Sequence, residues 1–111
     1  MSLDFYLITK DIDGNDHTVL SENITHNLTK MADKAGIYDA LWRPEEKNYK
    51  KAKDIIKVLE AGLKKLKDKP EYYKKFNAPN GWGLYEHFVP FAESILEGCK
   101  KYPSAKISCS R

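Results

Sequence analysis

Residues 23–28 have the sequence Asn-Ile-Thr-His-Asn-Leu, and they lie where a strand-like pattern gives way to a helix-like one. The first turn of a helix leaves backbone N–H groups unpaired, and a short oxygen-bearing side chain can accept one of them. Asn23 or Thr25 is therefore expected to cap the following helix. The same stretch places His26 opposite the apolar stripe of that helix and Asn27 at its edge. We expect this stretch to join a sheet to the helices and to present polar side chains.

The two ends of the chain predict a small antiparallel sheet. Residues 3–9 are rich in aromatic and β-branched residues, which is typical of a strand. Asp13-Gly14 is a strong hairpin signal because both central turn positions favour positive φ. Residues 17–20 form the expected return strand. Residues 104–110 read as a third strand that can pair with this hairpin.

Residues 11–22 also imitate a calcium-binding loop, since their first, third, fifth and twelfth positions carry oxygen ligands. The sixth position of such a loop is normally glycine and here is Asp16, and the eighth is normally aliphatic and here is Thr18. The preceding segment is strand-like rather than helical. The pattern therefore favours a plain hairpin turn, with calcium binding as the alternative.

Apolar residues at helical spacing predict three main helices between the hairpin and the last strand. The first ends at Gly36, the second begins at Pro44 and ends before Pro70, and the third covers residues 84–99. Pro90 lies inside the third helix and is expected to kink or divide it. Single helical turns are expected at residues 37–42 and 71–76.

Together these elements predict an α+β fold, with a small antiparallel sheet packed against three to four helices in one domain, residues 1–111. No apolar run approaches the roughly 18 residues of a membrane span. The N-terminus has neither the basic region nor the apolar core of a secretion signal. We therefore expect a cytoplasmic protein that does not associate with membranes.

The charge is distributed unevenly along the chain. Residues 1–46 carry nine acids and four bases, residues 47–75 carry eleven lysines and four acids, and residues 76–111 carry four bases and three acids. A basic middle segment can face an anionic partner, or it can be the solvated face of an amphipathic helix. It contains no arginine, the residue that dominates specific phosphate and base contacts. Nucleic-acid binding is therefore unlikely.

Three stretches combine turn residues, amides, aromatic rings and cations near helix starts. The candidate ligand-binding residues in them are His26, Asn27, Trp42, Arg43, Asn80, Trp82, Tyr85 and His87. Amides recognise hydrogen-bonding edges, aromatic rings stack on flat groups, and arginine or a helix N-terminus holds phosphate. This combination suits a nucleotide-type ligand, and it equally suits a protein interface. Each residue also has a structural interpretation, with the amides as caps, Trp42 in the core and Trp82 fixing a turn.

Catalysis is not indicated by the histidines or cysteines. His17, His26 and His87 lack the spacing of zinc ligands, and no pair of cysteines supports them. Cys99 falls on an apolar helical stripe where a thiol is inert, while Cys109 lies near the end of the chain. We expect reduced thiols, with a disulfide between the two as the alternative. No catalytic residue, metal site or cofactor is predicted.

The motifs at residues 23–28, 35–38, 41–46, 80–85 and 110–111 together resemble a family of small uncharacterised proteins of bacteriophages, prophages and bacterial genomes. The resemblance covers nearly the whole chain. Small early phage proteins often counter host defences, either by sequestering a nucleotide signal or by occluding a defence protein. The resemblance therefore implies a phage-encoded counter-defence protein acting in the host cytoplasm.

These observations lead to three hypotheses of function. The first is a small non-enzymatic binding protein that sequesters a small anionic or nucleotide-type ligand. The second is a protein-interaction module that inhibits a host protein, and the third is nucleic-acid binding through the lysine-rich helix. A homodimer is a further expectation, because a short sheet leaves an edge strand exposed.

Overall fold

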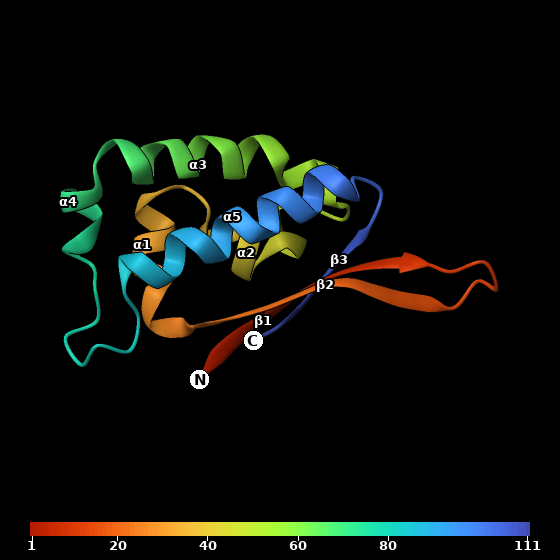
Figure 1. Ribbon diagram of the computed structural model, residues 1–111, viewed down its shortest axis with the longest axis horizontal. Coiled ribbons are helices and arrows are strands. Elements are labelled where there is room, and N and C mark those ends of the chain that lie inside the picture. Colours follow the sequence, from red (N-terminus) through yellow and green to blue (C-terminus); the bar gives the residue numbers. More distant parts are fainter.

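A computed structural model describes residues 1–111 and confirms the predicted α+β fold. Its sheet is antiparallel and three-stranded, with strands β1 (Ser2–Lys10), β2 (Asp16–Thr25) and β3 (Lys106–Ser110) in the order β2-β1-β3. The central strand β1 pairs with the return strand of the hairpin on one side and with the C-terminal strand on the other. The helices lie together on one side of this sheet (Figure 1).

The hairpin of β1 and β2 extends beyond the helices as a two-stranded arm (Figure 1). Asp11 Oδ1 accepts hydrogen bonds from the backbone N–H groups of Asp13 and Asn15, both at 2.9 Å. Gly14 takes the left-handed conformation that the turn requires, with φ of 82°. The predicted hairpin is thus confirmed, but positive φ was expected at both Asp13 and Gly14, and only Gly14 has it. The first carboxylate of the calcium-like pattern stabilises the turn.

The helical segments follow β2, with η denoting a 3-10 helix. They are η1 (His26–Leu28), α1 (Thr29–Lys34), α2 (Tyr38–Trp42), η2 (Pro44–Lys47), η3 (Ala52–Ile55), α3 (Ile56–Asp68), α4 (Pro70–Lys74) and α5 (Tyr85–Lys101). Thr25 Oγ1 accepts the N–H of Asn27 at 3.2 Å, which confirms the predicted cap at the sheet-to-helix junction. Gly36 ends the first helix with φ of 80°, also as predicted.

Two helix predictions need correction. The helix expected to run from Pro44 to Pro70 is interrupted after Lys47, because Asn48 is left-handed with φ of 59° and the next residues run beside β3. The last helix is continuous through Pro90, so of the two expected effects the division is wrong, while the kink stays a prediction. Pro90 and Glu86, whose carbonyl loses its helical partner, are both exposed, so water can satisfy that carbonyl.

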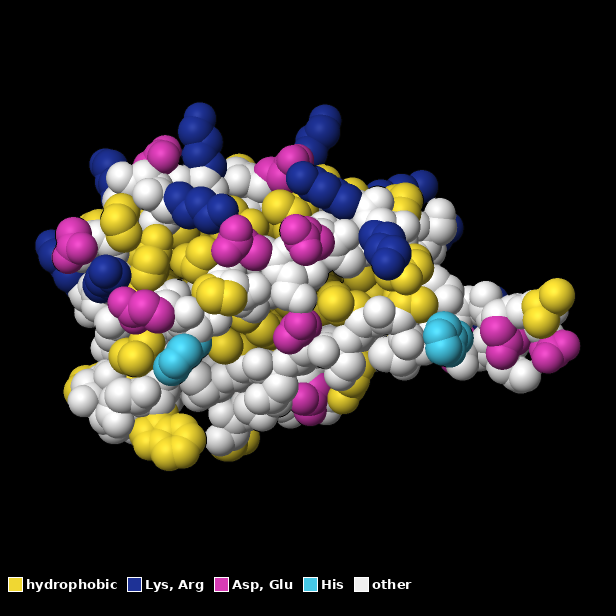
Figure 2. Space-filling view, in the orientation of Figure 1, with side chains coloured by type: hydrophobic (Ala, Val, Ile, Leu, Met, Phe, Trp, Pro, Cys, Tyr) yellow, Lys and Arg dark blue, Asp and Glu magenta, His cyan; other side chains and the backbone are white.

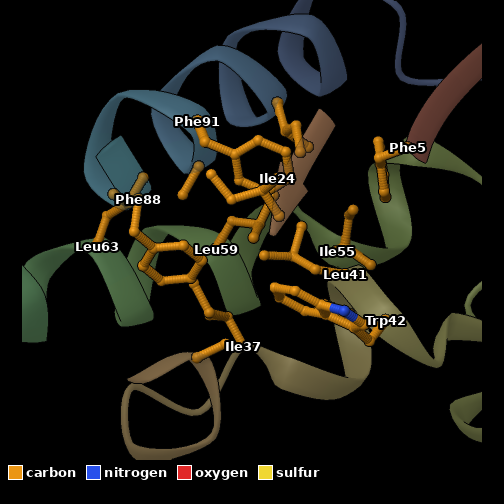
Figure 3. Packing of buried hydrophobic residues seen from close by; sticks show 14 of the residues in the cluster. Phe5, Ile24, Ile37, Leu41, Trp42, Ile55, Leu59, Leu63, Phe88 and Phe91 are labelled. Atoms are coloured by element: carbon orange, nitrogen blue, oxygen red, sulfur yellow. The ribbon is translucent and has the colours of Figure 1, made fainter. Parts of the chain in front are cut away.

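One hydrophobic cluster of 25 buried residues joins the sheet to the helices. Figure 3 shows Trp42, Leu59 and Phe88 pointing into this cluster from α2, α3 and α5. The rings of Trp42 and Phe88 are 6.5 Å apart. This packing fixes α2, which carries Trp42 and is followed directly by Arg43, two of the predicted site residues.

Four of the eleven lysines of the middle segment lie on α3. Figure 2 shows basic side chains projecting from the molecule at this helix. The opposite side of α3 buries Leu59, Leu63 and Leu66. The amphipathic interpretation of this helix therefore holds. No helix has both the length and the apolar character needed to cross a bilayer.

Candidate functional site

The structure brings two of the predicted residues, His26 and Trp42, into a direct hydrogen bond. The indole Nε1–H of Trp42 donates to Nδ1 of His26 at 2.9 Å. Trp42 is only 2% exposed, and Tyr38 is stacked against it with ring centroids 5.7 Å apart. One face of the indole is thus covered by Tyr38, and its polar atom is already paired. This geometry matches the core interpretation of Trp42, and it gives His26 a partner within the chain.

Arg43 follows Trp42 but points to other partners. Its Nε donates to the Tyr38 hydroxyl at 3.4 Å, and one of its terminal nitrogens lies 3.5 Å from the Glu46 carboxylate. Both interactions are long, and Arg43 remains half-buried. Its predicted contact with a ligand stays a prediction.

Asn27 connects residues 23–28 to the loop that precedes α5. Its side-chain Nδ2 donates to the backbone carbonyl of Trp82 at 2.7 Å. Within that loop, Asn80 Oδ1 accepts the N–H of Trp82 at 2.9 Å. Asn77 Oδ1 accepts the N–H of Tyr85 at 2.7 Å, where α5 begins. Three amide side chains therefore hold one loop, and two of them were predicted site residues.

The side chains of the remaining predicted residues, Tyr85 and His87, differ in their contacts. The Tyr85 hydroxyl donates to the carbonyl of Leu66 at 2.8 Å, which joins α5 to the end of α3. His87 is exposed, and its imidazole makes no hydrogen bond, although its backbone N–H donates to the carbonyl of Leu84 at 2.9 Å. The three stretches thus converge only through His26–Trp42 and Asn27–Trp82, while Arg43 and His87 stay outside these contacts.

The largest pocket lies elsewhere, between β3 and the interrupted helix. We call it the β3 pocket; its volume is about 690 Å³. It is lined by Pro44, Glu45, Asn48, Tyr49, Lys50, Lys51, Lys106, Ile107, Ser108, Cys109 and Arg111. None of the eight predicted ligand-binding residues is among them. Its size is typical of small-molecule sites, which occupy roughly 300–1,000 Å³.

Backbone pairing explains why the chain leaves the helix here and forms a wall of the pocket. The N–H of Ile107 donates to the carbonyl of Lys50 at 2.9 Å, and the N–H of Ala52 donates to the carbonyl of Ala105 at 2.8 Å. Asp54 Oδ2 accepts the N–H groups of Lys50 and Lys51, both at 3.0 Å. These two bonds hold the pKa of Asp54 below its usual value. An extended segment thus runs along the outer edge of β3.

The β3 pocket is strongly basic. Lys50, Lys51 and Lys106 line it, and none of them forms an ion pair. The fourth cation, Arg111, donates to the Trp42 carbonyl at 2.6 Å and also binds Glu45. The hydrogen bond from Arg111 to Glu45 lowers the pKa of the Glu45 carboxyl. The one carboxylate side chain in the pocket is therefore ionised and already paired. Three lysines therefore remain free to bind an anion.

The backbone of β3 adds hydrogen-bonding groups to this pocket. Groups along a strand alternate between its two sides, and the N–H of Ile107 points outward to Lys50. The N–H and carbonyl of Cys109 therefore face the same outer side, where β3 is a sheet edge. Burial raises the pKa of the Cys109 thiol to about 12, so this side chain is a neutral wall and not a nucleophile.

The sequence carried only a faint signal for this site. Lysines at residues 47–51 were assigned to a helix surface, because nothing in the apolar pattern marks the left-handed residue Asn48. The terminal Ser110-Arg111 belongs to the motifs that carry the family resemblance, and the sequence alone indicates no role for it. The adjacency of residues 50–52 to 105–107 depends on long-range pairing, which local patterns do not reveal.

The structure contains no group of three or more His, Cys, Asp or Glu side chains positioned to hold a metal ion. Both cysteines are free thiols. Cys99 is fully buried, and burial raises its pKa to about 12, as expected for a core thiol.

Comparison of the chain with protein-family models, with curated proteins and with solved structures finds no match. No residue role is therefore carried over from another protein.

Proposed function

We propose that this protein is a small non-enzymatic binding protein that holds an anionic, nucleotide-type ligand in the β3 pocket. The observation that carries the proposal is the set of three unpaired lysines around a pocket of about 690 Å³. Unpaired lysines favour phosphate groups electrostatically, and lysine is a frequent phosphate ligand in proteins. Tyr49 adds an aromatic ring and Ser108 a hydroxyl.

The other lining groups support a ligand that is only partly charged. Pro44, Ile107 and Cys109 provide apolar walls, which suit a base or sugar rather than a bare ion. The outward N–H of Cys109 can donate to a phosphate oxygen, since backbone N–H groups are common phosphate ligands. A sequestering protein of this kind is also what the resemblance to phage-encoded proteins implies.

Isothermal titration calorimetry with ATP, ADP, AMP, pyrophosphate and adenosine tests this proposal. The phosphate-bearing compounds are expected to bind and adenosine is not. Removing two of the free cations in Lys50→Ala/Lys106→Ala should weaken binding at least about 10-fold, because hydrogen bonds to charged groups contribute roughly 1.5–3 kcal/mol. The affinity should also fall with added salt.

The matched control is Lys57→Ala/Lys64→Ala, which removes the same charge from the exposed surface of α3. Equal affinity in the two double variants would mean that any anion is held by the net charge alone, and the proposal would fail. No heat with any of the phosphate compounds at millimolar concentration would also reject it. Native mass spectrometry of the same samples reports whether the predicted homodimer forms.

Nucleic-acid binding through α3 stays an alternative hypothesis. Its lysines are exposed along one surface (Figure 2). The Lys57→Ala/Lys64→Ala variant serves here as the test variant. Retardation of duplex DNA at low salt that this variant abolishes would favour the alternative.

A further inference from the structure

Trp82 is exposed to an unusual degree for a tryptophan. Its relative exposure is 73%, whereas the other tryptophan, Trp42, is 2% exposed. The Trp82 ring forms no aromatic pair, and its indole N–H makes no hydrogen bond. Figure 2 shows hydrophobic side chains protruding at the end of the molecule where the loop before α5 lies. The side chain of Trp82 therefore adds little to the stability of its own fold.

The backbone of Trp82 is, by contrast, firmly held. Its N–H donates to Asn80 Oδ1 at 2.9 Å, and its carbonyl accepts Asn27 Nδ2 at 2.7 Å. The loop is closed by a hydrogen bond from the N–H of Ala78 to the carbonyl of Gly83 at 2.8 Å. A side chain presented by a fixed backbone loses less conformational freedom on binding, which favours affinity.

Gly83 shows that this position of the loop is specified by close packing. Its φ is 131°, a conformation that other residues rarely adopt. A Cβ at this position would lie 3.1 Å from both Asn27 Cβ and Thr25 Cγ2. The loop therefore packs against the junction of β2 and η1 as closely as a glycine allows. Trp82, the residue before Gly83, is held in place by this packing.

A shallow groove of about 580 Å³ lies beside the loop; we call it the loop groove. Lys30 and Lys75 line it, and neither is in an ion pair. Asn77 and Asn80 use their Oδ1 atoms to accept backbone N–H groups, so their Nδ2 groups remain free to donate. The loop groove therefore offers two cations and two amide donors, a set that is complementary to carboxylates.

We propose that Trp82 and the loop groove form a docking surface for a segment of a partner protein that combines apolar side chains with carboxylates. The indole of Trp82 inserts among the apolar side chains, and the carboxylates bind Lys30, Lys75 and the free amide groups. Tryptophan is strongly enriched among the residues that dominate protein interfaces, and its burial removes 150–250 Å² from water. This surface shares no residue with the β3 pocket.

A displayed library of random 16-residue peptides, selected on the wild-type protein and counter-selected on Trp82→Ala, tests the proposal. Enriched peptides are expected to be rich in Asp, Glu and apolar residues. Synthetic copies should bind Trp82→Ala at least about 30-fold more weakly than wild type, as for a dominant interface residue. Ile12→Ala, which removes an exposed apolar side chain at the distant hairpin turn, should change the affinity less than about 2-fold.

Charge reversal provides the second variant. Lys30→Glu/Lys75→Glu should weaken the same peptides at least about 10-fold, whereas Lys57→Glu/Lys64→Glu should not. Circular dichroism is expected to show an unchanged fold for Trp82→Ala, since the side chain is exposed. Retained nucleotide binding by that variant would separate this surface from the β3 pocket.

Two results would overturn the proposal. The first is enrichment of no peptide that distinguishes wild type from Trp82→Ala. The second is a membrane outcome, in which vesicles with 30% phosphatidylserine, but no peptide, shift the emission of Trp82 to the blue. The free amide donors and the hollow shape of the loop groove favour a protein segment over a flat lipid surface.

Discussion

The hydrogen bond between Trp42 and His26 makes a quantitative prediction about which candidate residues are structural. Trp42 Nε1 lies 2.9 Å from His26 Nδ1, and the indole is 2% exposed. Replacing His26 with Ala leaves a buried N–H donor without an acceptor. Such a loss costs about 1–3 kcal/mol. For a domain of this size, that corresponds to a fall in Tm of roughly 4 °C for each kcal/mol.

Urea unfolding followed by circular dichroism measures this cost, and His26→Asn is the matched control. The Oδ1 atom of asparagine occupies nearly the position of the imidazole Nδ1, so it can accept the same indole N–H. His26→Asn should therefore be more stable than His26→Ala by about 1 kcal/mol. Equal stability of the two variants would show that the hydrogen bond is not what His26 contributes.

A double-mutant cycle with Trp42→Phe isolates the pair. Phenylalanine has no N–H, so His26→Ala should cost about 1 kcal/mol less in this background than in wild type. A coupling energy near zero would refute the reasoning. His26 can either support the fold through Trp42 or contact the ligand, and the nucleotide affinity of His26→Ala distinguishes these two roles. Unchanged affinity fits the structural role, and lost affinity fits the predicted ligand contact.

Three further predictions concern packing, thiols and acid stability. Gly62→Ala should destabilise the fold by about 1–3 kcal/mol in urea unfolding, although alanine normally stabilises a helix, because its Cβ would overlap Ile37 Cγ2. Cys99 and Cys109 have pKa values raised to about 12, so labelling by a thiol reagent at pH 8 should be slow in the native protein and fast in denaturant. The carboxylate of Asp54 has a pKa lowered from 3.8, so its stabilisation is complete at neutral pH and is lost as pH falls through the lowered pKa. The stability difference between wild type and Asp54→Ala should accordingly be about 1 kcal/mol at pH 7 and smaller at pH 3.

Local signals were sufficient for most of the fold. Asp13-Gly14 requires a tight turn, so the pairing of β1 with β2 follows from local chemistry. The third strand followed from its position after the last helix and from the unpaired edge of the hairpin. Thr25 and Gly36 marked the start and end of the first helical segment, and both do so in the structure.

The β3 pocket could not be predicted because its decisive residue has no distinctive pattern. Asn48 interrupts the helix by adopting a left-handed conformation, which asparagine tolerates better than most residues but does not require. After this interruption, Lys50 and Ala52 pair with the segment around Ile107, more than 50 positions away in the chain, and local patterns do not reveal such pairing. Lys50 and Lys51, which suggested a solvated helix surface, therefore line the pocket.

The two proposed surfaces lie at opposite ends of α3, which is the basis for treating them as separate. Residues 50–53 precede this helix beside β3, whereas the loop before α5 lies past its far end (Figure 1). The 13 residues of α3 span roughly 20 Å at 1.5 Å per residue. A nucleotide in the β3 pocket cannot reach Trp82 across that distance, so steric exclusion between the two ligands is not expected.

Any effect of one ligand on the affinity for the other must pass through the packed core, in which α3 and α5 are adjacent. Titration of a selected peptide in the presence and absence of a saturating nucleotide measures that coupling, and unchanged affinity would identify two independent sites on one rigid domain.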